Sequence, residues 1–349
     1  MSEKSSHTAH SPMRDPRAIG IAVAVIAVAG VWWMASAKES VQDYAAFDAD
    51  ALRVSDLAGS LHIEVTDDST ISVTAHGPSD ALKRLDIGTR DGTLVIDQDR
   101  GLGWIRIFGL RDRDMDVTVR IPKGIPVSID DLTGELFVGD ISAPIDVDGH
   151  ITGGQVGDVT SAAVALNGSS NLKFGKVSGA LVLRLSGSGR ASVESANTAA
   201  ITVSGSGNFS IGDVAENLAL SLRGSAVATA GSAQSAALSI SGSGKLQVAE
   251  VRSGLALNIR GSGVGAIGSL NGPAEIAISG SGSATIEDGR AGPFVAEIHG
   301  SGRLDFGGIA IDPMLTVTGS GRIVVATHQG TLIADGDNIV VNGERVANR

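Results

Sequence analysis

The sequence predicts an all-β chain folded as a parallel β-solenoid (β-helix) of about ten rungs, each 18–20 residues long. Three observations lead to this fold class. Gly-Ser-Gly-like tripeptides recur at a nearly constant spacing, and apolar residues keep fixed offsets from them. The apolar residues alternate with polar ones, which is the period of a strand. Aromatic residues make up only 3% of the 349, whereas glycine supplies 47, as expected for a narrow core with many tight corners.

The repeat is marked by the first glycine of each tripeptide. These glycines lie 18, 19 or 20 residues apart, and Gly149 extends the series upstream by another 19; they are Gly168, Gly187, Gly205, Gly224, Gly242, Gly261, Gly280, Gly300 and Gly319. Each corner is expected to need a positive φ, which glycine adopts without strain.

Apolar residues at the strand period fill the positions that we expect to face the core. They lie four and two residues before each first glycine, as Leu183 and Leu185 do, and four and six after it, as Leu172 and Phe174 do. Another apolar residue comes nine after: Val177, Val214, Val251, Leu270 and Ile309. Each rung therefore reads as two short strands around a corner, followed by a third short side, with rungs stacked ~4.8 Å apart.

The N-terminal part of the chain predicts export. Residues 18–37 are uncharged and apolar, and twenty helical residues span ~30 Å, the hydrocarbon thickness of a bilayer. Basic residues precede this run and acidic residues follow it, which places residues 1–17 in the cytoplasm and residues 38–349 in the periplasm. We expect one transmembrane helix that anchors the chain in the inner membrane.

A cleaved signal peptide is the alternative reading of the same segment. Ala35-Ser36-Ala37 fits the small-x-small pattern before a cleavage point, which gives a protein secreted after cleavage near Ala37. Both readings export the remainder of the chain.

The remaining segments are assigned by their patterns. Residues 38–44 form a linker, and residues 45–145 alternate as strands without the Gly-Ser-Gly spacing, so we expect a β-rich segment that caps the first rung. Within it, residues 99–114 form a long loop in which Trp104 and Phe108 are candidates for contact with a partner. Residues 146–349 form the solenoid with its own C-terminal cap.

Several kinds of chemistry find no support in the residues. There are no cysteines, and the seven histidines are scattered, so we expect no metal and no cofactor. Every Gly-Ser-Gly corner leads into a strand, whereas a phosphate-binding loop leads into a helix. The acidic residues lie at varying offsets and no long loops build a cleft, so no catalytic residue is assigned. A net charge of −11 argues against nucleic acid as a partner.

One ordered outer surface remains on the strand before each corner. Positions one and three before the first glycine point away from the core and carry mostly Ser and Thr with some basic residues. This pattern has two interpretations. It is either a sheet surface that contacts only solvent, or a shallow recognition face for glycan or protein. The candidate recognition residues are Arg184, Ser186, Ser204, Arg223, Ser241, Arg260, His299 and Thr318.

The strings ISGSG, VSGSG and VTGSG, with Ile121-Pro-Lys-Gly124 and Pro126-Val-Ser-Ile129, resemble the bacterial putative auto-transporter adhesin, head GIN domain family. The resemblance covers roughly residues 45–345 and implies an exported β-solenoid; it supplies no catalytic residues to carry over to this chain.

We therefore expect an exported, non-catalytic module that binds or scaffolds an envelope glycan or protein. Two alternatives stay open: an enzyme acting on polysaccharide, and a membrane-anchored accessory of envelope-stress signalling.

Overall fold

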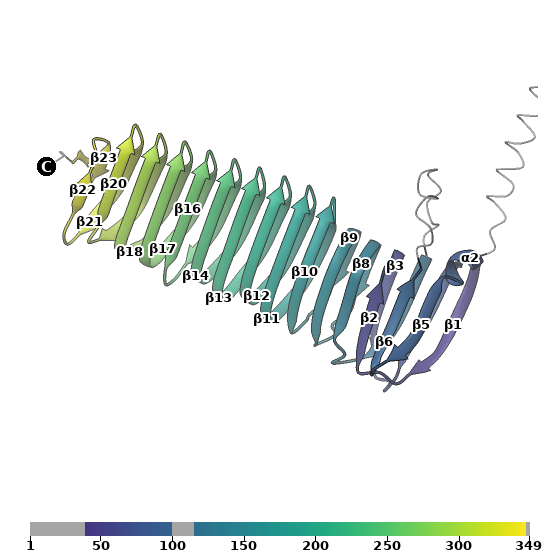
Figure 1. The fold of residues 1–349 in the computed structure, drawn as a ribbon. Helices are drawn as coiled ribbons and strands as arrows, with labels where there is room; N and C mark the ends of the chain where they lie inside the picture. The colour runs from purple at the N-terminus through teal and green to yellow at the C-terminus, as the bar shows by residue number, and fades with distance from the viewer. Residues whose placement is uncertain (1–38, 100–114, 347–349) are drawn as a thin grey trace, which may run out of the picture.

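The computed structural model describes residues 39–99 and 115–346, and it is a parallel β-solenoid of about 11 turns (Figure 1). Parallel stacking was predicted from the repeat and is confirmed. Gly187 lies opposite Gly205, Gly205 opposite Gly224, and Gly224 opposite Gly242. Equivalent residues of successive rungs therefore form columns along the axis.

The repeat region consists of long strands that end at the first glycine of each corner or at the opposite bend. They are β9 (Pro144–Val156), β10 (Ser161–Gly168), β11 (Asn171–Gly187), β12 (Arg190–Gly205), β13 (Asn208–Gly224), β14 (Val227–Gly242), β15 (Lys245–Val251), β16 (Leu255–Gly261), β17 (Val264–Gly280), β18 (Ser283–Gly300), β19 (Arg303–Ile311), β20 (Met314–Gly319) and β21 (Arg322–Gln329).

Each rung has two faces joined by two edges. One sheet, here called the pre-corner sheet, holds the residues that lead up to each first glycine, such as 181–186 of β11. The post-corner sheet holds those that follow the tripeptide, such as 190–193 of β12. The expected third side is only a bend in β11, where pairing with β12 shifts register between Val177 and Ala180. We call the two edges the corner edge and the bend edge.

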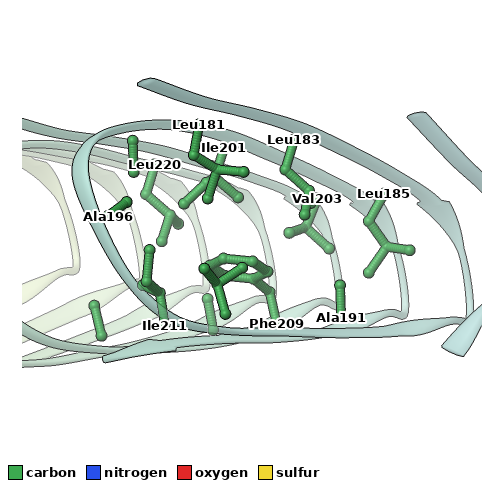
Figure 2. Packing of buried hydrophobic residues seen from close by; sticks show 14 of the residues in the cluster. Leu181, Leu183, Leu185, Ala191, Ala196, Ile201, Val203, Phe209, Ile211 and Leu220 are labelled. Carbon is green, nitrogen blue, oxygen red and sulfur yellow. The ribbon is translucent and has the colours of Figure 1, made fainter. Parts of the chain in front are cut away.

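The core lies between the two sheets, and Figure 2 shows Leu181, Leu183 and Leu185 facing Ala191 and Phe209. The positions two and four before, and four and six after, each corner are buried as expected, Leu185 and Leu222 completely. Ile309 is the exception among the predicted core residues. It is half-buried, and Ala310 takes the inward position instead, since the register shifts between Phe306 and Ile309.

The corners have the positive φ that was expected, but at one position of the tripeptide only. The first glycines from Gly187 to Gly319 have φ between +95° and +116°. The third residue of the tripeptide has no positive φ, and in one repeat it is Ala226, which is buried.

Gly149 does not mark a corner, contrary to the expectation from its spacing. It lies opposite Leu166, and β9 continues past it as one strand. The first corner instead contains Ser170, which is fully buried. Its hydroxyl accepts a hydrogen bond from Ile151 N (3.0 Å) and donates one to Asn167 O (2.7 Å).

The N-terminal end combines parallel rungs with antiparallel closing strands. Parallel pairs such as β2 with β6 and β3 with β7 begin near residue 51, within the segment expected to be a cap. Antiparallel pairs close the end, β1 with β4, β4 with β7 and β5 with β6. The elements are β1 (Glu39–Phe47), β2 (Ala51–Ser55), β3 (Ala58–Thr66), β4 (Ile71–Pro78), α2 (Ser79–Leu82), β5 (Leu85–Arg90), β6 (Thr93–Gln98), β7 (Met115–Pro122) and β8 (Val127–Val138).

The C-terminal end is closed by three short strands: β22 (Ile333–Asp335), β23 (Ile339–Val341) and β24 (Glu344–Arg345). β23 pairs parallel with β21, and β24 pairs antiparallel with β23.

The expected membrane segment, residues 18–37, lies outside the described residues, as do Trp104 and Phe108. Among the residues that are described, no helix has the length and apolar character needed to cross a membrane.

Candidate binding face

The candidate recognition residues form two neighbouring columns on the outside of the pre-corner sheet. Arg184 belongs to the column three residues before each first glycine and lies opposite Thr202, which lies opposite Ser221. The other seven share the column one residue before the glycine: Ser186, Ser204, Arg223, Ser241, Arg260, His299 and Thr318. All of them are exposed except Ser204, which is half-buried. These side chains therefore lie in two outer columns, with successive members ~4.8 Å apart.

The polar side chains of this face have few contacts with one another. Within these two columns, His299 Nε2 lies 3.9 Å from Glu297 Oε2, and this contact is an ion pair only when the histidine is protonated. Arg184, Arg223 and Arg260 form no ion pair with any residue of 39–99 or 115–346. Their donors are therefore open to solvent or to a ligand.

A column of small apolar residues lies beside the polar columns, five positions before each first glycine. Its middle is Ala200, Ala219, Ala237 and Ala256 in successive rungs, and Val182 precedes them. Because alanine side chains end at Cβ, the surface is lower there than over the neighbouring positions. Glu275 interrupts the column before it ends on Val295 and Met314.

The alanine column forms part of the floor of a shallow groove that runs along the axis. Three adjoining hollows of about 730, 580 and 420 Å³ make up this groove, and Val182 lines all of them. Thr202, Ser221, Ser239 and Asn258 also line it, so the groove borders the predicted polar ladder. The groove was missed in the sequence, although alanine recurring five residues before the corner was a visible signal.

Two carboxylates of the bend edge, Asp213 and Asp158, accept hydrogen bonds from the next rung. Asp213 Oδ1 accepts hydrogen bonds from both Ser232 N and Ser232 Oγ, each at 2.8 Å. These bonds from the backbone and the hydroxyl of Ser232 hold the pKa of Asp213 below its ordinary value of 3.8. Asp158 Oδ1 accepts from Lys176 N in the next rung (2.8 Å) in the same way. These carboxylates satisfy backbone groups where the strands bend.

The described part of the chain contains no group of three or more His, Cys, Asp or Glu side chains placed to hold a metal ion. The outer surface of the pre-corner sheet presents hydroxyl, amide and guanidinium groups in a regular array beside the alanine column.

Comparison with known families identifies the family of this chain. A family model described as putative auto-transporter adhesin, head GIN domain, matches residues 53–250, which is more than half of the chain. The chain belongs to this family. The resemblance inferred from the Gly-Ser-Gly strings is thereby confirmed.

The match to the head GIN domain family covers part of the candidate face. It runs from β2 into β15, so it includes Arg184, Ser204, Arg223 and Ser241. The rungs that carry Arg260, His299 and Thr318 lie beyond it. These further rungs keep the same register, as the pairing of Arg260 with Ser279 and of His299 with Thr318 demonstrates.

Solved structures with some likeness to this chain include three proteins of low identity. A putative adhesin from Bacteroides fragilis is 16% identical over 66% of this chain and 97% of its own, with a TM-score of 0.46. A putative lipid binding protein from Parabacteroides distasonis is 15% identical over 82% and 96%, with a TM-score of 0.36. A putative cell adhesion protein from Clostridium sporogenes is 16% identical over 64% and 98%, with a TM-score of 0.23. No curated protein matches the sequence.

Proposed function

We propose that this chain is an exported, non-catalytic module that binds or scaffolds a polymer of the cell envelope through its pre-corner sheet. One observation carries the proposal: the strict register of the rungs turns single exposed residues into a continuous polar ladder beside an apolar groove. Membership of a family described as adhesin supports a binding role.

The shape of the face favours an extended ligand. Each rung adds a hydroxyl, amide or guanidinium group and a patch of alanine surface, and each contact alone is weak. Contacts on successive rungs of one rigid body act together, because after the first one forms the others are intramolecular. A polymer with repeating units gains from this arrangement, whereas a small molecule touches only one or two rungs.

We further propose that residues 18–37 anchor the protein in the inner membrane and that residues 38–349 lie in the periplasm, with secretion after cleavage near Ala37 as the alternative. The proposal rests on the uncharged run and on the distribution of charges around it. N-terminal sequencing of the mature protein from membrane and soluble fractions tests it. A protein that begins at its first residue in the membrane fraction supports the anchor, and one that begins near residue 38 supports cleavage.

The binding role is tested with the full-length protein and with peptidoglycan and soluble glycan prepared from the envelope. We expect one of these polymers to bind the protein. Size-exclusion chromatography of that polymer should show the same chain length before and after incubation with the protein. Release of shorter fragments would contradict the non-catalytic assignment and point to a polysaccharide-acting enzyme.

A further inference from the structure

The corner edge carries a net positive charge, which the net charge of the whole chain does not show. Consider the outer positions one and three residues before, and three and five after, each first glycine from Gly168 to Gly319. In these four columns the acidic residues are Glu297 and Asp305. The basic residues are Lys173, Arg184, Arg190, Arg223, Lys245, Arg260, Arg303 and Arg322. Yet the chain as a whole has a net charge of −11.

The bend edge of the same rungs has the opposite sign. Its basic residues are Lys176, Arg252 and Arg290, and its acidic residues are Glu194, Asp213, Glu216, Glu250, Glu287, Asp288 and Asp312. Charge is therefore separated across the width of the solenoid, with the positive side along the Gly-Ser-Gly corners.

The basic side chains of the two edges differ in their partners. On the bend edge, Lys176 pairs with Glu194 (3.5 Å) and Arg252 with Glu250 (3.0 Å). On the corner edge, Arg303 is paired, with Asp305. The other seven are exposed and form no ion pair within residues 39–99 and 115–346: Lys173, Arg184, Arg190, Arg223, Lys245, Arg260 and Arg322.

The register places these unpaired charges in columns on both sides of the corner edge, on the pre-corner and on the post-corner sheet. Arg184 and Arg190 lie on either side of the Gly187 corner, Arg223 follows two rungs later, and Lys245 and Arg260 follow on the next two. From the rung of Lys173 to that of Arg322 the positively charged edge extends about 38 Å at ~4.8 Å per rung. Upstream it ends, because Asp148 occupies the column of Ala165 and Arg184.

We propose that the corner edge binds a linear anionic polysaccharide, with carboxylate or sulfate groups along its length, lying parallel to the solenoid axis. This inference rests on the proposed function and names its ligand class. Arginine guanidinium groups bind carboxylate and sulfate oxygens with two parallel hydrogen bonds, which favours this ligand over a neutral glycan. The sugar rings then have the alanine column as an apolar neighbour.

A polysaccharide fits the edge better than a nucleic acid does. Proteins that bind single strands place aromatic side chains under the bases, and the four columns hold no Phe, Tyr or Trp. The acidic bend edge also repels a phosphate backbone that wraps around the molecule.

The test compares two triple variants with the same change in net charge. R184Q/R223Q/R260Q removes unpaired charges from the corner edge, and K176Q/R252Q/R290Q removes an equal number from the bend edge. Binding of the full-length proteins to polygalacturonate, to neutral dextran and to single-stranded DNA is measured by affinity electrophoresis at low and at moderate salt. We expect polygalacturonate to be bound and dextran not to be retained.

The corner-edge variant should bind polygalacturonate about tenfold more weakly with a shallower salt dependence, since fewer counterions are released. The bend-edge variant should stay within about twofold of the wild type, because exposed pairs that face away contribute little. Thermal melting of both variants checks that each keeps the fold.

Each other outcome overturns the inference in a distinguishable way. Equal losses in the two variants would mean that only overall charge matters. Equally tight binding to dextran, unaffected by the arginine changes, would reject the anionic ligand but leave the proposed binding role in place. Equal binding to single-stranded DNA, lost in the corner-edge variant, would reject the polysaccharide. Failure to bind any of these polymers or the envelope glycans would overturn both proposals.

Discussion

Two glycines of one corner, Gly242 and Gly244, are constrained for different reasons. Gly242 has φ = +116°, and a Cβ there would lie 2.6 Å from the carbonyl oxygen of Gly224 in the rung before. Gly244 has no positive φ, and its Cβ would lie 2.9 Å from Ala226 O. The sequence predicted that the corner needs a positive φ but not which of its two glycines adopts it. The presence of Ala226 at the third position of another corner was the available hint.

Gly242→Ala should therefore destabilise the protein by about 1–3 kcal/mol, because an alanine there has to keep the positive φ and its Cβ clashes with the preceding rung. Gly244→Ala should cost clearly less. Urea denaturation followed by circular dichroism gives both values. If the two substitutions cost the same, the corner does not depend on the backbone angle of its first residue.

The lowered pKa of Asp213 predicts a small pH dependence of the free energy of unfolding. Its pKa is lowered in the folded state by the two Ser232 donors, so its contribution is present above its unfolded pKa and is lost as pH falls through the folded value. Because the side chain is exposed, solvent screening keeps the effect under about 1 kcal/mol. The free-energy difference between wild type and Asp213→Asn should thus shrink between pH 6 and pH 2. A difference that stays constant over this range would exclude the carboxylate as its source.

At the scale of the elements, alternation of apolar and polar residues was sufficient to identify the strands and the inward side of each. It was not sufficient to define how a rung bends. The expected third side is a register shift near Val177, and at Ile309 the shift turns a predicted core residue partly outward. A single repeat does not reveal such shifts, because they are defined by the pairing with the neighbouring rung. For the same reason Gly149 was mistaken for a corner.

The alternation itself is testable in β14, where Ile240 is fully buried and Ser241 is exposed. Ile240→Asp should cost more than about 4 kcal/mol or prevent folding, because it places an unpaired carboxylate between the two sheets. Ser241→Asp adds the same charge one residue later and should change the melting temperature little. Similar melting curves for the two variants would contradict the assignment of inward and outward sides.

At the scale of the whole molecule, the regular repeat made the architecture predictable, because each rung contacts mainly its two neighbours. The candidate site was predicted in part. The polar columns follow from the offsets, whereas the groove and the charge separation emerge only when the columns of several rungs are aligned.

Removal of one complete rung tests this modular organisation. Deletion of residues 243–261 joins Gly242 to Ser262 and restores both the corner and the register, since Gly242 and Gly261 lie opposite each other. We expect a folded protein with one cooperative unfolding transition. Deletion of residues 243–252 removes about half a rung, joins Gly242 to Ser253, and should abolish folding of the downstream rungs. Equal damage from the two deletions, measured by circular dichroism and limited proteolysis, would refute a modular stack.

The ladder of backbone hydrogen bonds runs along the solenoid axis, with β1 at one end and β23 near the other (Figure 1). Tension between these ends loads the bonds along their own direction, so the outermost rung peels off before its neighbours. An 18–20-residue rung releases about 65 Å of chain at ~3.4 Å per residue. A protein tethered at one end and bound to a polymer along its side would thus yield under mechanical load in repeated, equal steps.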